Sequence, residues 1–246
     1  MVWLALALSC APKEVAPVAR EIDFKSELGR YGEWIVLRPY GRVWHPNESI
    51  VGPGFIPYAT GGQWRPSPDG WEFESSWGWG EYTFHRGRWL MGESGFGWVW
   101  LPDQERAVSW VDWRVGPDWI AWTPIPPANV NTRKMEPWER PWSVVKTRVF
   151  TQPDIRTHLQ AQEGVMKALN LTTELPAAKA RFGPDLELVR NGGGMLADGG
   201  VPDLTPPPDP NPPPPEVAPA EEKPPEEEAP PPPKKTGKKK KGKKGK

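Results

Sequence analysis

The sequence predicts a mainly β fold, in which antiparallel tryptophan-rich hairpins form an open sheet or a small barrel. Most of the sixteen tryptophans lie between Gly61 and Pro127. Aromatic and apolar residues alternate there with polar residues or glycine, at 71–74, 82–85 and 108–113. A period of two places one set of side chains on one face of a strand, so each run is predicted to be β.

Turn residues and a loose repeat support the hairpin prediction. Glycine, proline and aspartate interrupt the aromatic runs at 67–70, 92–95, 101–103 and 116–118. A Gly-polar-Trp step at 62–64 is followed by a Gly-Trp-x-aromatic step at 70–73, and the same order recurs at 87–89 and 97–100. One such unit is too short to bury its own rings, so the units are expected to pack together.

Several motifs carry a resemblance to a known family. They are YGRVW at 40–44, WGW at 77–79, YTFHRGRW at 82–89, GWVWLP at 97–102 and WVDWR at 110–114. In this order they resemble an uncharacterised family of bacterial exported, tryptophan-rich β proteins, labelled as a domain of unknown function. The resemblance extends over roughly Ile22 to Leu204. It implies an exported β domain and supplies no activity.

The N-terminus resembles a lipoprotein signal. Residues 1–10 are a short apolar run that ends in Leu-Ala-Leu-Ser-Cys, which predicts Cys10 as the acylated residue. The alternative is an unmodified cysteine that is buried by chance. A lipidated Cys10 followed by Ala11 resembles outer-membrane sorting, so we expect an envelope location that faces the periplasm or the cell surface. Residues 11–21 form a tether, and no later segment is apolar enough to cross a bilayer.

The β domain is expected to span 22–204, with its repeat core at 31–127. Beyond the core, a strand is predicted within 142–150 and a short helix over 154–162, ended by Gly164. Residues 165–175 suit either a helix or a strand, and the family resemblance favours a strand. A final short strand is expected at 186–189.

Two segments of biased composition follow the domain. Residues 205–233 form a proline-rich spacer, predicted to be disordered and extended, with a reach of roughly 90 Å at about 3 Å per residue. Residues 234–246 form a polylysine tail, and the rest of the chain is net acidic although the formal charge of the whole is zero. The lysines of the tail are Lys234, Lys235, Lys238, Lys239, Lys240, Lys241, Lys243, Lys244 and Lys246.

The lysine tail allows three interpretations. It could hold anionic envelope material such as lipopolysaccharide or acidic groups of peptidoglycan. It could equally be a solvated tail that keeps the protein soluble. Binding of nucleic acid is the third interpretation and requires a cytoplasmic protein, so the predicted export ranks it last.

The central tryptophans also allow two interpretations. Exposed rings could form a platform for a polysaccharide, and buried rings would simply be the core, which we favour. Because the rings are too many for one thin sheet to hide, some exposed aromatic surface is expected. The candidate ligand-binding residues are Trp77, Trp79, Trp89, Trp98 and Trp100.

The sequence contains no nucleophile motif, no phosphate-binding glycine loop and no metal-ligand spacing, so neither a cofactor nor a metal is expected. His85 is predicted to stack on an aromatic neighbour, and Arg86 and Arg88 to lie over tryptophan faces. Carboxylate pairs remain as a glycosidase alternative, Glu72 with Glu74 and Asp112 with Asp118.

The sequence therefore predicts a non-catalytic envelope lipoprotein with a structural or binding role. The alternatives are a hydrolase of cell-wall polysaccharide and a cytoplasmic protein that associates with nucleic acid through the lysine tail.

Overall fold

The computed structural model describes residues 21–92, 95–128, 130 and 135–196. All of them belong to the first of two units of the chain, Met1–Asn211. Cys10 with the signal segment, nearly all of the tether, the proline-rich spacer and the lysine tail lie outside the described residues.

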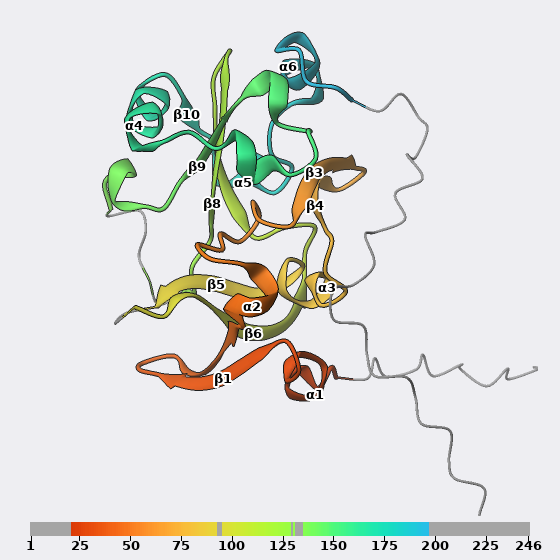
Figure 1. Cartoon of the computed structure of the whole chain (residues 1–246). Helices are drawn as coiled ribbons and strands as arrows, with labels where there is room; N and C mark the ends of the chain where they lie inside the picture. The colour runs from red at the N-terminus through yellow and green to blue at the C-terminus, as the bar shows by residue number, and fades with distance from the viewer. Residues whose placement is uncertain (1–20, 93–94, 129, 131–134, 197–246) are drawn as a thin grey trace, which may run out of the picture. The chain divides into compact units, whose positions relative to one another are not determined.

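The strands form three antiparallel sheets (Figure 1). The first has the order β1 (Gly32–Leu37), β2 (Gly41–Pro46), β6 (Gly97–Arg106) and β5 (Arg86–Gly92). The second has the order β10 (Thr173–Glu174), β7 (Val111–Val115), β8 (Trp119–Pro124) and β9 (Ser143–Lys146). The third pairs β3 (Gly62–Ser67) with β4 (Gly70–Ser75). In the described part of the chain these sheets are open, and none closes into a barrel.

Short helices connect and flank the sheets. The α-helices are α1 (Phe24–Leu28), α2 (Glu48–Val51), α3 (Gly80–Thr83), α4 (Gln162–Asn170), α5 (Ala177–Ala180) and α6 (Leu186–Asn191). The 3₁₀ turns are η2 (Pro137–Glu139), η3 (Thr147–Val149) and η4 (Ile155–His158). Among the described residues no helix combines the length and the apolar character that crossing a bilayer requires.

The predicted repeat corresponds to two hairpins. Its first copy is β3–β4, where Trp64 lies opposite Phe73, and its second is β5–β6, where Trp89 lies opposite Trp100 at the equivalent position. The two other described hairpins have the same kind of pair, which is Trp34–Trp44 in β1–β2 and Trp113–Trp122 in β7–β8. Cross-strand aromatic pairs stabilise antiparallel strands, so each hairpin contains its own aromatic centre.

One aromatic core joins all three sheets. Its buried rings come from the first sheet (Trp44, Trp89), from β3–β4 (Trp64) and from the second sheet (Trp113, Trp122). Trp64 lies at its centre, with ring centroids 4.7 Å from Trp113 and 5.7 Å from Trp122. Tilted and edge-to-face contacts dominate, as the quadrupoles of the rings favour.

Indole N–H groups donate to irregular backbone, and five of the donors belong to this core. In the described residues, seven tryptophans each donate from Nε1 to a backbone carbonyl. The acceptors are the carbonyls of Leu28, Tyr58, Thr83, His85, Arg86, Pro137 and Pro184. Most of these carbonyls lie in turns, loops or helix ends, where no strand partner satisfies them. We call these contacts the indole clamps.

Two predictions inside the repeat core were wrong, and a third was partly wrong because β7 covers only the second half of the strand expected at 108–113. Residues 82–85 are not a strand, since α3 ends at Thr83 and β5 begins at Arg86; four alternating residues are too few to separate a strand from one helical turn. Residues 101–103 are not a turn but lie within β6. Pro102 is tolerated there because the β5–β6 register shifts between Arg86 and Arg88, which leaves a bulge where proline removes no ladder bond.

The predictions beyond residue 127 were partly wrong. Only 143–146 of the predicted 142–150 strand is β, followed by η3. The helix expected at 154–162 is only the 3₁₀ turn η4, and Gly164 lies inside α4 rather than ending a helix. Residues 165–175 are helical to Asn170, with only Thr173–Glu174 as a strand. Residues 186–189 begin α6, because the Asp185 side chain caps the amides of Glu187 and Leu188.

Candidate functional site

The five tryptophans predicted as ligand-binding candidates are buried. Trp77 and Trp98 are 7% exposed, and Trp79, Trp89 and Trp100 are at most 1% exposed. Trp77 and Trp79 stack on each other, with centroids 4.8 Å apart. A polysaccharide platform needs accessible ring faces, so burial assigns these side chains to the core, which was the favoured interpretation. Some exposed aromatic surface was expected because one thin sheet could not cover all the rings. Three sheets contribute to the core, so all five rings are buried.

Two of these tryptophans nevertheless border a surface hollow of about 240 Å³. Its wall is mostly apolar and includes Trp89, Trp98, Leu90, Met91, Pro124 and Pro141. Met91 is half exposed at the rim. Because Thr123 also lines this space, we call it the Thr123 hollow.

Thr123 is the unusual residue of the hollow. It lies near the end of β8, a strand whose residues are all buried, and its own side chain is fully buried. In the part of the chain that the structure describes, its Oγ1 atom has no hydrogen-bond partner. Alternation along β8 places Thr123 on the same face as Trp119 and Ala121, away from Trp122 and the central aromatic core. The Thr123 hydroxyl is therefore closed off from solvent and has no partner among the described residues.

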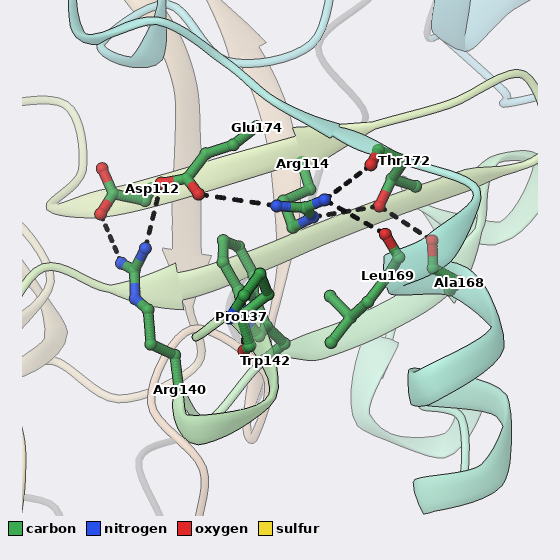
Figure 2. A network of polar contacts seen from close by, with 9 residues as sticks. All are labelled: Asp112, Arg114, Pro137, Arg140, Trp142, Ala168, Leu169, Thr172 and Glu174. Carbon is green, nitrogen blue, oxygen red and sulfur yellow. Dashed lines mark hydrogen bonds and ion pairs between the residues drawn. The ribbon is translucent and has the colours of Figure 1, made fainter. Parts of the chain in front are cut away.

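A buried arginine, Arg140, also lines the hollow, and Figure 2 shows its ion pairs with Asp112 and Glu174. Asp112 is the cross-strand neighbour of Thr123, and its carboxylate accepts a hydrogen bond from Arg140. Arg140 also donates to Glu174 at 3.1 Å, and its guanidinium lies 4.8 Å from the ring centroid of Trp142. The Arg140 side chain is only 5% exposed, so both carboxylates compensate a charge that has lost most of its hydration.

Arg114 extends the network to the end of α4. Its guanidinium donates to the carbonyls of Leu169 and Thr172 at 3.1 and 2.7 Å, and it lies 3.6 Å from Glu174 (Figure 2). Burial lowers the pKa of Arg114, while the charge of Glu174 opposes this shift. These contacts hold α4 and β10 against β7, which is a structural role.

His85 has polar neighbours instead of the predicted aromatic one. Its Nδ1 donates to the carbonyls of Ala107 and Val108 at 3.2 and 3.1 Å. Its Nε2 lies 3.4 Å from Glu72 and 3.6 Å from Glu81. The side chain is buried, and its contacts connect β4, α3 and the loop after β6.

The prediction for Arg88 is confirmed, since its guanidinium lies 3.3 Å from the ring centroid of Trp110. Arg86 instead donates to the carbonyl of Gln104.

Three of the four carboxylates of the glycosidase alternative contact basic side chains. Glu74 accepts from Arg65, Glu72 lies beside His85, and the Asp112 carboxylate is held by Arg140. Across the described ranges, no group of three or more His, Cys, Asp or Glu side chains is arranged to hold a metal ion.

The aromatic hairpins from β1 to β8 lie within the part of the chain that matches a known family. Residues 25–129 match DUF6600, a family of unknown function. The DUF6600 match confirms the predicted resemblance, and it includes Thr123 but ends before Arg140. The predicted continuation of the resemblance to Leu204 stays a prediction. No curated protein and no solved structure matches the chain.

Sequence reasoning identified Trp89 and Trp98 but missed Thr123. The available signal was its position in Trp119-Ile-Ala-Trp-Thr-Pro124, where a hydroxyl interrupts an otherwise apolar run. That signal predicts a buried hydroxyl, but it does not tell whether a backbone carbonyl satisfies it.

Proposed function

We propose that the protein is a non-catalytic lipoprotein of a bacterial cell envelope, anchored at Cys10 and contacting anionic envelope material through the lysine tail. The apolar run that ends in Ser9-Cys10 supports the anchor. Cys10 is also the single cysteine of the chain, which fits a lipid attachment site better than a disulfide.

Segregation of charge is the observation that carries the proposal. The last thirteen residues hold nine lysines, whereas the rest of the chain is net acidic. In the folded domain, arginines such as Arg65, Arg106 and Arg140 already pair with carboxylates. Positive charge is therefore densest in the tail, where it can neutralise a polyanion.

The ion pairs of the domain also support a role without catalysis. A glycosidase needs one carboxylic acid and one carboxylate free to face the substrate. Glu74 and Asp112 are instead held by arginines, and Asp112 is mostly buried in its pair. Such contacts stabilise the fold and leave these groups poorly placed for proton transfer.

The intact mass of protein purified from its native membrane fraction tests the anchor. We expect cleavage before Cys10 with an added diacylglycerol and acyl chain, and an unmodified mass for Cys10→Ser. A full-length, unmodified mass in the soluble fraction would contradict the anchor, and the tail would then have to be tested against DNA and RNA.

Binding to vesicles with anionic headgroups tests the tail separately. The parent chain should bind at low salt and dissociate as salt is raised, whereas a chain lacking 234–246 should not bind. Both chains should unfold at the same temperature. Equal binding by the two chains would refute the role of the tail without affecting the anchor.

A further inference from the structure

We propose that the open edge of β1 pairs with β1 of a second copy of this chain, so that two four-stranded sheets join into one antiparallel sheet across a two-fold axis. This inference goes beyond the proposed function and depends on neither the lipid anchor nor the lysine tail. It rests on the backbone of β1, on the absence of features that protect a sheet edge, and on the self-complementary side chains of the strand.

Alternate residues of β1 direct their backbone groups away from the sheet. β1 is the outermost strand of the first sheet and pairs on one side only, with β2 (Figure 1). The amide of Asn47 donates to the carbonyl of Tyr31, and hydrogen-bonded pairs alternate along an antiparallel ladder. This contact therefore sets which residues bond to β2. Gly32, Trp34 and Val36 have their N–H and C=O groups on the open side.

The residue opposite Gly32 agrees with this alternation. It is Pro46, which has no N–H to donate to β1. Among the described residues, no backbone hydrogen bond outside the β1–β2 ladder reaches Gly32, Trp34 or Val36. A row of unpaired donors and acceptors with the spacing of a strand is complementary to another extended strand.

β1 lacks the features that usually protect an edge. Natural edge strands are short, or contain proline, lysine or a bulge. β1 has six residues, pairs with β2 in an uninterrupted register and contains neither proline nor lysine. Other described edges are protected, since β10 has only two residues, the β5–β6 register contains a bulge, and the carbonyl of Val144 in β9 accepts from the amide of Gln160.

The apolar side chains of β1 complement a second copy of the same strand. An antiparallel pair centred on Ile35 places Trp34 of each copy opposite Val36 of the other, so the open-side groups of these residues exchange hydrogen bonds. Val36 is 74% exposed in the single chain and would lie beside an indole in the pair. Aromatic residues opposite β-branched residues stabilise paired strands.

The charges of β1 favour the same arrangement. Glu33 near the start of the strand and Arg38 just after its end are both exposed. An antiparallel pair brings Glu33 of one copy close to the Arg38 end of the other, whereas a parallel pair would place the two Glu33 carboxylates side by side. Opposite charges therefore select the two-fold arrangement and a second copy as the occupant.

The mass of the full chain in solution is the first test, and Cys10→Ser is included to exclude lipid and disulfide effects. Joining two edges buries little area, so the dimer should dissociate in the micromolar range. Sedimentation velocity should show the mass of one chain at about 1 μM and approach that of two chains at about 500 μM. Val36→Lys should weaken association about ten-fold or more, because it places a charge at the pairing edge. Met166→Lys, at an exposed apolar residue of α4, should leave it unchanged.

Introduced thiols test the register in the same Cys10→Ser chain. Ile35 would face its own copy as a non-hydrogen-bonded pair, with Cα atoms about 4.5 Å apart, which suits a disulfide. The two Val36 residues would lie diagonally, about 7 to 8 Å apart, which is too far. Ile35→Cys should therefore cross-link on oxidation, and Val36→Cys should not. Random collision predicts the reverse, because Val36 is the more exposed residue.

Amide exchange separates a second copy from other occupants of the edge. In dilute solution, the amides of Trp34 and Val36 should exchange quickly while that of Ile35, bonded to β2, is protected. At high concentration all three should be protected. If Trp34 and Val36 are already protected in the monomer, a segment of the chain itself covers the edge, and the proposal is wrong.

Three further results would overturn the proposal. The first is the mass of a single chain throughout the concentration range. The second is equal association of the Val36→Lys and Met166→Lys variants, which would place the interface elsewhere. The third is cross-linking of Val36→Cys as fast as Ile35→Cys, which would contradict a pair centred on Ile35.

Discussion

Trp64 and Trp122 provide a direct test of how buried indole N–H groups affect stability. Both side chains are fully buried in the aromatic core, and their ring centroids are 5.7 Å apart. They differ in one respect, since Trp122 Nε1 donates to the carbonyl of Tyr58 at 3.0 Å, whereas Trp64 Nε1 has no hydrogen-bond partner among the described residues. We therefore compare Trp64→Phe with Trp122→Phe, each made alone.

The expected magnitudes follow from this difference. Replacing either indole by a phenyl ring leaves a small void, with a shared cost of roughly 1 to 2 kcal/mol. Trp122→Phe also leaves the buried Tyr58 carbonyl without its indole donor, which adds about 1 to 3 kcal/mol. Trp64→Phe removes an unpaired N–H and recovers a similar amount, so its net effect should be within about 1 kcal/mol of the parent.

Urea unfolding followed by far-UV circular dichroism measures this difference without depending on tryptophan fluorescence. We expect the free energy of unfolding of Trp122→Phe to lie about 2 kcal/mol or more below that of Trp64→Phe, with similar m-values. If Trp64→Phe is as destabilising as Trp122→Phe, the Trp64 N–H is satisfied in solution, and the reasoning from unpaired polar atoms fails.

Three further predictions concern charge, proton binding and backbone conformation. Arg140→Ala should lower the free energy of unfolding by about 2 kcal/mol in urea titrations, because it removes a buried side chain and leaves the partly buried Asp112 carboxylate without its partner. Arg190→Ala, at an exposed ion pair, should stay within about 0.5 kcal/mol, and equal effects would contradict the role of burial. Burial raises the pKa of Tyr58 above its ordinary value of about 10. Above that pH the unfolded chain loses a proton that the folded chain keeps, so the free energy of unfolding should fall by up to about 1.4 kcal/mol per pH unit, and Tyr58→Phe should flatten this fall. Gly61→Ala should cost about 3 kcal/mol or more by thermal unfolding, because φ is +66° and a Cβ would lie 2.4 Å from an indole carbon. Gly41→Ala, at φ +83° with open space around it, should cost only about 1 kcal/mol.

The hairpins could be predicted because the information that specifies them is local. A period of two, a short turn and the repeat of aromatic positions are all visible within about a dozen residues. The equivalence of Trp64–Phe73 and Trp89–Trp100 follows from that repeat alone. The packing of the hairpins is not local, since β2 joins β6 through Trp44 and Trp100 and skips the hairpin between them.

The wrong predictions and the missed site residue have physical causes of the same kind. In the segment at 186–189, an aspartate cap outweighed the apolar pattern that favoured a strand. The five candidate tryptophans are buried because sheets distant in sequence cover them, which one strand pattern cannot show. Whether the Thr123 hydroxyl has a partner depends on which groups of other elements reach it, and among the described residues none does.

The indole clamps imply that mutations are tolerated unevenly along the chain. An indole N–H recognises a backbone carbonyl, which every amino acid provides, so the clamped loop positions place little demand on side-chain identity. The tryptophan itself has no substitute that combines its size with a donor at the same place. Relatives of this domain should therefore keep their tryptophans while the loops between them diverge. The clamped loops should resist proteases as well as the strands do, because opening a loop would withdraw a carbonyl from a donor inside the core.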